Sequence, residues 1–599
     1  MSSNPAMNMG SLRALYRSGQ TKPTDIVAMV YDRIRSAPLA PVWIALVPRE
    51  AALARARDLE RDPLAPARPL YGIPFAVKDN IDIAELPTTA SCPAFAYSPS
   101  RSAAVVDALI DAGAIPIGKT NLDQFATGLV GTRSPYGACS SVFDDRYISG
   151  GSSSGSAVAV ASGMVTFALG TDTAGSGRVP AAFNNLIGLK PTRGLLSTRG
   201  VVPACRTLDC VSILAATAHD AHTVWQAARA FDPDDPFSRT ALPGQSATPW
   251  LGGSFRFGVP TAEHLEFFGD QQAAALFQKA VGDLQQLGGE PEEIDYAPFW
   301  AAAELLYSGP WVAERLAALG AFLGAHPQQM NPVVHEIIAA ARGYTAVEAF
   351  EAGYRLRGLR RETEAQWERM DVLVLPTAGT IYTHEQVAAE PIRLNTNLGY
   401  YTNFVNLLDL AAVAVPAGFR SSGLPFGISL IGQAFRDEAL LTLADRFHAA
   451  TSERPGPAID VGMAPPDCIA LAVVGAHLTG QPLNWQLTGR GARLMKTCRT
   501  APGYRLYALE KTIPSKPGLL RDDGFRGTGI EVEVWAVPED QFGGFVAAIP
   551  SPFGIGTVTL DSGEVVKGFV CEPYALAAAN EITHFGGWRA YLTQAVHAR

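Results

Sequence analysis

The sequence predicts an α/β domain followed by a small β-rich domain, and three observations carry this prediction. Short apolar runs alternate with amphipathic helical patterns until about residue 450, as in proteins whose helices pack on a sheet. At 599 residues, the chain is longer than one hydrophobic core usually organises. Beyond a Pro-rich stretch at 454–467, the pattern changes to short strands separated by Gly and Pro turns.

The first part of the chain contains the elements of the α/β pattern. In chain order, the predictions are a helix at 26–34 with Thr24 as its N-cap, a helix near 50–60, a buried strand at 69–77, a helix at 103–112 and a buried strand at 114–118. Residues 121–137 are expected to form a loop. Lys78 follows the first strand directly, which is unusual because most lysines lie in solvent.

The chain is organised around residues 150–178, where two loops of small residues bracket one apolar run. The first loop carries Ser152, Ser153 and Ser154, and the second carries Ser176. The run between them is apolar enough to be buried. Because the neighbours of Ser176 are small, a substrate can reach the backbone N–H groups of that loop. The layout is typical of acyl transfer to a serine.

Two other interpretations of the first loop remain open at this point. Gly- and Ser-rich strings are often flexible linkers, although a linker would not lead through a buried run into a second loop. The loop also satisfies the G-x-S-x-G nucleophile elbow of α/β-hydrolases, with Ser153 as nucleophile. That alternative needs a downstream acid and histidine, for which Asp371 and His448 are candidates.

A serine nucleophile needs a base, and no histidine stands in either loop. A lysine in an apolar pocket can serve, because desolvation disfavours the ammonium form and lowers the pKa. Lys78, Ser152 and Ser176, with 24 positions between the serines, closely resemble the Ser-Ser-Lys triad of the amidase signature family of serine hydrolases. The resemblance implies an α/β/α sandwich with a mixed central sheet. It also implies that Ser176 is the nucleophile, Ser152 the relay serine and Lys78 the base.

The same resemblance has implications for the two loops. The peptide bond between Gly151 and Ser152 is expected to be cis. Asp172 and Arg178 are expected to brace the second loop rather than to act on substrate. The oxyanion hole is expected to consist of the backbone N–H groups of Thr173, Ala174, Gly175 and Ser176.

The region after residue 193 is predicted to contain further helices and strands around a polar surface excursion at 232–249. The predicted elements are helices at 277–287, 301–320 and 438–450 and buried strands at 371–375 and 411–415. His335 and Glu336 match the start of the zinc-binding motif H-E-x-x-H. Position 339, where the motif needs a second histidine, is Ala, so a metalloprotease site is excluded.

Tyr307 and Arg315 lie eight positions apart in the predicted 301–320 helix, which places them on nearly the same face. By spacing alone, they are an ordinary half-buried tyrosine and a solvated arginine. The chain also resembles the allophanate hydrolases, a branch of the amidase signature family, in which such a pair holds the carboxylate and ureido group of the substrate. This resemblance implies substrate contacts for Tyr307 and Arg315, with a backbone contact from Gly128.

The predicted boundaries are 1–455 for the amidase signature domain, 456–467 for a Pro-rich linker and 468–599 for the C-terminal domain. Strands are predicted in the last part at 469–475, 504–510, 529–537 and 556–560. This part resembles the C-terminal domain of allophanate hydrolases, which is related to the γ-glutamylcyclotransferase fold. His477, just after a predicted strand, is a candidate general acid or base there.

Composition limits the partners that the chain can have. The formal charge of −9 gives no support for a nucleic-acid or anionic-membrane surface, and no apolar run reaches the length of a membrane span. The seven cysteines lack C-x-x-C pairs, so neither disulfides nor zinc are indicated, and a reducing cytoplasm is expected. No cofactor or metal is expected.

The resulting hypothesis is hydrolysis of allophanate (urea-1-carboxylate) to ammonia and carbon dioxide, through an acyl-enzyme and N-carboxycarbamate. The resemblance implies a homodimer that acts in urea or s-triazine and cyanurate nitrogen catabolism, with possible coupling to a separate urea carboxylase. The alternatives are a general amidase, a glutaminase-like component of a tRNA amidotransferase and a catalytically silent scaffold.

Overall fold

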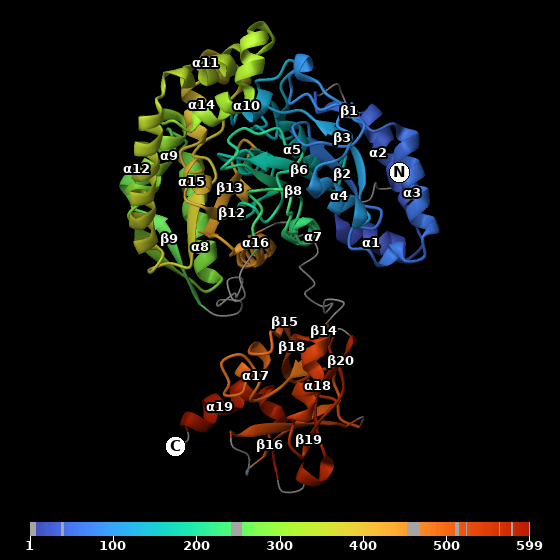
Figure 1. Ribbon diagram of the computed structural model, residues 1–599. Helices are drawn as coiled ribbons and strands as arrows, with labels where there is room; N and C mark the ends of the chain where they lie inside the picture. The colour runs from blue at the N-terminus through green and yellow to red at the C-terminus, as the bar shows by residue number, and fades with distance from the viewer. Residues whose placement is uncertain are drawn as a thin grey trace. The chain divides into compact units, whose positions relative to one another are not determined.

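The computed structural model describes residues 7–36, 41–240, 254–451, 468–509, 514–522, 524–561, 563–576 and 579–597 (Figure 1). The chain divides into two compact units, Met1–Ala458 and Ile459–Arg599. The predicted linker at 456–467 lies outside the described residues.

An eleven-stranded mixed sheet forms the centre of the first unit, with the order β1-β3-β2-β6-β8-β7-β12-β13-β11-β9-β10. Its middle strands β2, β3 and β6 are parallel, whereas β8 runs antiparallel to β6. The strands are β1 (Trp43–Leu46), β2 (Pro74–Lys78), β3 (Ile115–Thr120), β6 (Phe167–Asp172), β7 (Ile187–Lys190), β8 (Cys210–Ala215), β9 (Phe255–Pro260), β10 (Gly289–Ile294), β11 (Val372–Pro376), β12 (Leu410–Phe419) and β13 (Pro425–Gln433). A separate hairpin joins β4 (Ser140–Ser141) and β5 (Asp144–Ile148).

Helices cover both faces of this sheet, and strand β11 shows why. Val372 and Val374 belong to one hydrophobic cluster, whereas Leu373 and Leu375 belong to another. Because successive side chains of a strand point to opposite faces, each face has its own apolar layer. The first cluster includes residues of α7, α8 and α16, and the second includes residues of α9 and α15. The predicted α/β/α architecture is therefore confirmed.

The helices of the first unit are α1 (Met9–Arg17), α2 (Pro23–Ser36), α3 (Arg49–Arg61), α4 (Ala104–Asp111), α5 (Ser154–Ala161), α6 (Arg178–Phe183), α7 (Ala218–Ala228), α8 (Gln271–Gln286), α9 (Ala297–Ser308), α10 (Val312–Ala325), α11 (Pro332–Ala340), α12 (Ala346–Gln366), α13 (His384–Ala389), α14 (Arg393–Leu398), α15 (Phe404–Leu407) and α16 (Asp437–Thr451).

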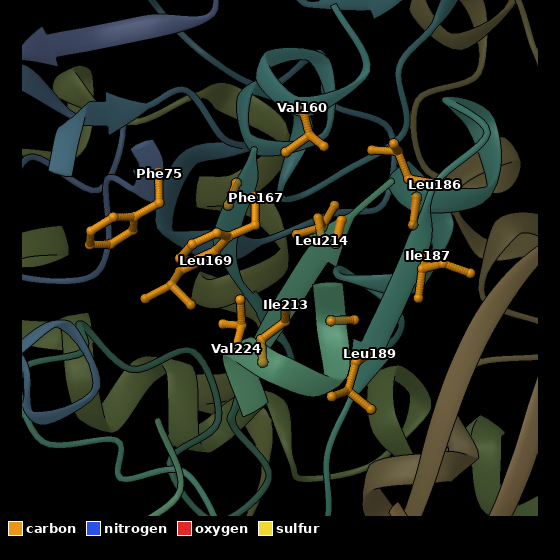
Figure 2. Packing of buried hydrophobic residues seen from close by; sticks show 14 of the residues in the cluster. Phe75, Val160, Phe167, Leu169, Leu186, Ile187, Leu189, Ile213, Leu214 and Val224 are labelled. Carbon is orange, nitrogen blue, oxygen red and sulfur yellow. The ribbon is translucent and has the colours of Figure 1, made fainter. Parts of the chain in front are cut away.

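The packing between β2 and β6 sets the position of the two strand ends. The strands are in parallel register, with Phe75 opposite Phe167 and Val77 opposite Leu169. Figure 2 shows the two phenylalanine rings side by side, and their centroids are 5.1 Å apart. All four residues are fully buried, so a shift in register would move apolar side chains out of the core. The carboxyl ends of β2 and β6 therefore lie next to each other.

Two predictions about the first unit need correction, and a third needs a qualification. Helix α2 begins at Pro23, so Thr24 lies inside its first turn rather than at the N-cap, because proline is already set for the first helical position. The predicted 301–320 helix is two helices, α9 and α10, separated at Gly309 and Pro310. The start of the predicted 232–249 excursion is a surface segment with Pro233, Asp234 and Pro236 exposed, but Asp232 and Asp235 are buried and accept hydrogen bonds from Ser197. Residues 241–249 lie outside the described part.

The second unit is rich in β-structure, as predicted. It contains a five-stranded sheet of order β15-β18-β14-β20-β19 and a three-stranded sheet of order β17-β16-β21. The predicted strands correspond to β14 (Cys468–Val473), β16 (Tyr504–Leu509), β18 (Glu531–Pro538) and β19 (Phe553–Thr559). The others are β15 (Arg493–Arg499), β17 (Lys516–Arg521), β20 (Val565–Cys571) and β21 (Asn580–Glu581), with helices α17 (Trp485–Thr488), α18 (Glu539–Ala547) and α19 (Trp588–His597).

Candidate active site

Lys78 is the last residue of β2 and is fully buried. Its Nζ donates hydrogen bonds to Ser152 Oγ and to Thr171 Oγ1, each at 2.7 Å. Thr171 stands near the end of β6, the strand that lies beside β2. The parallel register of β2 and β6 places the Lys78 amine beside Thr171. Ser152 of the first serine loop lies within hydrogen-bond distance of the same amine.

The environment of Lys78 favours the neutral amine. Burial lowers the pKa of Lys78 from an ordinary value of 10.5 to about 7. The carboxylates of Asp123, Asp172 and Asp209 oppose this effect, and the Arg315 guanidinium adds to it. Near neutral pH, a large fraction of Lys78 can therefore accept a proton.

We expect the rate of acylation to rise with pH through about 7 and to level off above it, because only the neutral form of Lys78 can act as a base. The measurement is kcat/KM between about pH 5.5 and about pH 9 under conditions where the chemical step limits turnover. A flat profile over this range would contradict the assignment of Lys78 as base.

The first serine loop separates the roles of its serines. The Gly151–Ser152 peptide bond is cis, as the resemblance implies. Ser152 directs its hydroxyl to Lys78, whereas Ser153 Oγ donates to the carbonyl of Thr171 at 3.2 Å and accepts from the Thr171 N–H at 3.4 Å. Because Ser153 is bound to the backbone of β6, its hydroxyl holds the loop on the sheet. This arrangement gives the nucleophile-elbow alternative no support.

The second serine loop places Ser176 beside the first. The carbonyl of Ser176 accepts a hydrogen bond from the N–H of Ser153 at 3.3 Å, and Ser176 Oγ donates to the carbonyl of Gly128 at 3.4 Å. Gly175 has a φ of 123°, and a Cβ at this position would lie 2.4 Å from Thr402 Oγ1. Only glycine fits there, so the tight approach of the loop to Thr402 depends on residue 175.

Asp172 and Arg178 brace this loop. Arg178 donates to both carboxylate oxygens of Asp172, at 2.9 and 3.0 Å, and both side chains are fully buried. Asp172 also accepts from the N–H groups of Gly175 and Gly177. Burial alone would raise the pKa of Asp172, but the Arg178 guanidinium and these hydrogen bonds hold it below its usual value. The loop is therefore fixed by a charged carboxylate beneath it.

These hydrogen bonds bear on the four predicted oxyanion donors. The N–H of Gly175 is already donated to Asp172 Oδ1 at 2.8 Å. Within the part of the chain that the structure describes, no acceptor lies within hydrogen-bond distance of the N–H groups of Thr173, Ala174 and Ser176. The loop can therefore offer three of the four donors to a ligand without losing the Asp172 brace.

Tyr307 and Arg315 lie close together, although they do not belong to one helix as predicted. They belong to two helices, α9 and α10, which are separated by a break at Gly309 and Pro310. The Arg315 guanidinium carbon lies 5.8 Å from the centre of the Tyr307 ring. The pair is thus formed by tertiary packing across a helix break rather than by two turns of one helix.

Arg315 is a buried cation in the first unit. Its side chain is 1% exposed, and its Nη1 donates to Thr127 Oγ1 at 2.9 Å. Among the described residues, no carboxylate oxygen lies within 4 Å of its guanidinium nitrogens. Thr127 precedes Gly128, whose carbonyl binds Ser176. Burial opposes the charge of Arg315, but Cys205, Tyr307 and Asp209 raise its pKa above the usual value, so the guanidinium stays charged. Since the described residues place no carboxylate at close range, it can bind an anionic ligand.

Sequence reasoning missed several residues around Lys78. Thr171 accepts hydrogen bonds from both Lys78 and Asn80, the latter at 3.3 Å. Asp209 accepts from the hydroxyl of Thr173 in the second loop. Asn80 follows Lys78 closely in sequence, which was a usable signal. Thr171 and Asp209 could be recognised only by knowing that β6 lies between β2 and β8.

His477 belongs to the second unit and lines a cavity of about 260 Å³ together with Gln486, Lys516, Phe545 and Phe569. Its Nε2 donates to Gln486 Oε1 at 2.9 Å, and its ring stacks on that of Phe569 with the centroids 4.9 Å apart. Burial lowers the pKa of His477 below its usual value. The histidine is therefore a mostly neutral group that faces a small, partly open cavity.

Comparison with known proteins assigns a family to each of the two units. The amidase family model matches residues 25–441, and the model described as the allophanate hydrolase C-terminal domain matches residues 469–593. The solved structure of Kluyveromyces lactis allophanate hydrolase is 44% identical, with a TM-score of 0.76 over 97% of this chain and 98% of that chain.

Two curated relatives differ in their sequence identity to this chain and in the share of each protein that is matched. Urea amidolyase of Saccharomyces cerevisiae is 46% identical over 94% of this chain, but only 32% of its own length is matched, so the chain spans about a third of that relative. A glutamyl-tRNA(Gln) amidotransferase subunit from Cyanothece sp. is 31% identical over 74% of this chain and 98% of its own length. The chain therefore belongs to the amidase family, and its second unit belongs to the allophanate hydrolase C-terminal domain family.

Proposed function

We propose that the chain hydrolyses allophanate, with the amide attacked in the first unit. The observation that carries this proposal is the buried Arg315 guanidinium, which lies beside Tyr307 and lacks a carboxylate within 4 Å among the described residues. Allophanate carries one carboxylate and one terminal amide. A substrate of this charge would satisfy Arg315 while its amide reaches Ser176. Similarity to the K. lactis allophanate hydrolase supports the same substrate.

In the proposed mechanism, neutral Lys78 takes a proton from Ser152, and Ser152 takes the proton from Ser176. Ser176 Oγ then bonds to the terminal carbamoyl carbon, and the N–H groups of the second loop stabilise the resulting oxyanion. The C–N bond breaks, and the proton returns through Ser152 to the leaving nitrogen, which departs as ammonia. Water cleaves the acyl-enzyme by the same relay and releases N-carboxycarbamate. Loss of carbon dioxide from this product gives carbamate and then ammonia.

We expect Arg315→Ala to lower kcat/KM on allophanate by roughly 30-fold to several thousand-fold, since truncating one partner of a desolvated charge pair costs about 2–5 kcal/mol. The control is malonamide, a neutral amide that never pairs with the guanidinium and should be affected little. Arg315→Lys keeps the charge but not the bidentate geometry, so it should recover part of the loss. Equal losses on charged and neutral substrates would make Arg315 structural and would weaken the case for allophanate.

A substrate panel separates this proposal from its alternatives. Ammonia release from allophanate but not from glutamine would argue against a glutaminase-like role in an amidotransferase, the activity named for the relatives at about 31% identity. Broad turnover of urea, biuret, malonamate and simple amides would indicate a general amidase. A chain that releases ammonia from none of them would be a silent scaffold.

We propose that the second unit acts on the product of the first, with His477 as its acid or base. The support is the cavity of about 260 Å³ around a neutral, buried imidazole, together with the C-terminal domain match at residues 469–593. His477→Ala should leave the first release of ammonia intact and slow the disappearance of N-carboxycarbamate. Loss of the first step in this variant would count against separate roles for the two units.

We also propose a homodimer, and the exposed apolar face of α12 is the surface that favours it. Val347, Phe350 and Tyr354 lie at helical spacing and are each about two-thirds exposed. Glu348 and Glu351 lie in the same half of the helix as this face. The other half carries four arginines and two glutamates, so the two halves have net charges of opposite sign. Two copies of α12 packed antiparallel about a twofold axis would place acidic halves against basic halves.

The oligomeric state tests this surface. Phe350→Glu combined with Tyr354→Glu should convert a dimer to a monomer in light scattering coupled to gel filtration. Val565→Glu, at an exposed apolar position of the second unit, is the matched control and should leave the mass unchanged. A monomeric wild-type chain, or a dimer that survives the double substitution, would overturn the assignment.

The cellular setting is also part of the proposal. In the described residues, no helix is long and apolar enough to cross a membrane. Urea amidolyase extends well beyond the third of its length that this chain matches. We propose that a separate urea carboxylase supplies the allophanate here, in the cytoplasm, as part of urea or s-triazine nitrogen catabolism.

A further inference from the structure

Two buried guanidinium groups hold the same short segment, residues 126–128. Arg133 and Arg315 are 3% and 1% exposed. Arg315 Nη1 donates to the hydroxyl of Thr127 at 2.9 Å, and Arg133 Nη1 donates to the carbonyl of the same residue at 3.0 Å. In the described ranges, no carboxylate oxygen lies within 4 Å of the Arg133 guanidinium either. The hydrogen bonds of the Arg133 guanidinium thus go to backbone carbonyls, and the Asp123 carboxylate acts on its charge from a longer distance.

The segment that Arg133 binds has an unfavourable backbone. Phe125 and Ala126 have φ values of 51° and 53°, in the left-handed region that residues with a Cβ rarely adopt, and Gly128 has a φ of 141°. Such a backbone persists only where its surroundings over-determine it. Arg133 connects it to the rest of the unit, because its Nη2 donates to the carbonyl of Pro391 at 2.7 Å.

The guanidinium also lies directly on Gly128. A Cβ at this position would be 2.9 Å from Arg133 Nη1 and 3.1 Å from Asp123 Oδ2, so the glycine leaves room for the guanidinium. The carbonyl of Gly128 accepts the hydrogen bond of Ser176 Oγ, and the next carbonyl, that of Leu129, accepts from the N–H of Gly151 at 2.8 Å. A shift of residues 126–128 would therefore disturb hydrogen bonds to both serine loops.

We propose that Arg133 is a positioning residue for the reaction proposed above, which keeps the carbonyl of Gly128 aimed at Ser176. In this division of roles, Arg315 recognises the carboxylate of the substrate and Arg133 aligns the acceptor beside the nucleophile. The inference rests on the proposed function only for the identity of the substrate. A displacement of about 1 Å near reacting atoms can lower a rate by about 100-fold, which sets the scale of the effect.

The experiment uses malonamate and malonamide, which differ in charge but share the amide that reacts. Arg133→Ala should lower kcat by about 10-fold to about 100-fold on both substrates and change KM little. Arg315→Ala should instead act selectively on malonamate. The rate at which an alkyl fluorophosphonate modifies Ser176 should fall with Arg133→Ala as well, and this reagent needs no carboxylate contact.

Two variants and one additive separate positioning from general damage to the fold. Arg133→Lys retains one donor and should give intermediate kcat values, and guanidinium ion should partly restore kcat in Arg133→Ala. Arg420 is the control, because it is also buried and donates to a backbone carbonyl, that of Pro425, at 2.6 Å. Unlike Arg133, it also pairs with Asp270 at 3.0 Å. Arg420→Ala should lower the melting temperature without lowering kcat.

The outcomes that overturn the inference are distinct from failure of the proposed function. A loss confined to malonamate would make Arg133 a second anion-binding residue, and an unchanged kcat and fluorophosphonate rate would remove its positioning role. If the wild type cleaved malonamide but neither malonamate nor allophanate, the proposed function would fall. The effect of Arg133→Ala on malonamide would still decide the inference.

Discussion

Ser176→Ala is expected to abolish ammonia release, with a loss on the order of 10⁴-fold or more in kcat, because the attacking oxygen is removed. The fold should remain, since the hydroxyl makes a single long hydrogen bond, 3.4 Å to the carbonyl of Gly128. The measurement is ammonia release from allophanate by the purified variant, with circular dichroism to verify the fold. Turnover comparable to that of the wild type would refute the triad.

Ser153→Ala is the matched control, one position from the relay serine. Its hydroxyl is occupied by the backbone of Thr171, so its removal should lower the free energy of unfolding by about 1 kcal/mol and leave substantial activity. If Ser153→Ala were as inactive as Ser176→Ala, the nucleophile-elbow interpretation would gain ground instead.

The sequence was sufficient to propose Lys78, Ser152 and Ser176 as the reacting residues, because the signals that point to them are local. The apolar residues before Lys78 indicate a buried strand, and the small residues around Ser176 indicate an open turn. The structure then places Lys78 Nζ 2.7 Å from Ser152 Oγ, which no spacing could show. The alternation of strands and helices follows from patterns of period two and 3.6. The two-domain organisation follows from the chain length and the Pro-rich stretch, and the α/β/α sandwich was implied by the family resemblance.

What the sequence could not supply depends on the order of strands in the sheet and on tertiary contacts. Thr171 and Asp209 reach the site only because β6 lies between β2 and β8. The hydrogen bond from the Gly175 N–H to Asp172 likewise depends on how the loop folds and could not be predicted from the sequence. The break between α9 and α10 could have been predicted from the sequence, because Pro310 removes a helix donor and clashes with the preceding turn.

Removal of the Lys78 amine is the second test with a large expected effect. Lys78→Met keeps the length and apolar stem of the side chain, so it removes the base with little change in packing. We expect kcat to fall by about 10²-fold to about 10⁴-fold, the usual contribution of a general base. Lys78→Arg should be equally inactive, because a guanidinium stays protonated and cannot accept the proton of Ser152. Activity in Lys78→Arg would show that a fixed charge at this position is sufficient.

The stability of Lys78→Met gives an independent test of the same pKa. Because burial lowers the pKa of Lys78 to about 7 in the folded state, the unfolded chain binds more protons between about pH 7 and pH 10.5. Below pH 7, the folded protein therefore carries the full cost of a buried ammonium, up to about 5 kcal/mol, and this cost vanishes above pH 10.5. Lys78→Met should raise the free energy of unfolding at pH 6 and change it little at high pH. A variant that is less stable than the wild type at pH 6 would mean that the ammonium is stabilised in the site, and Lys78 would then be a poor base.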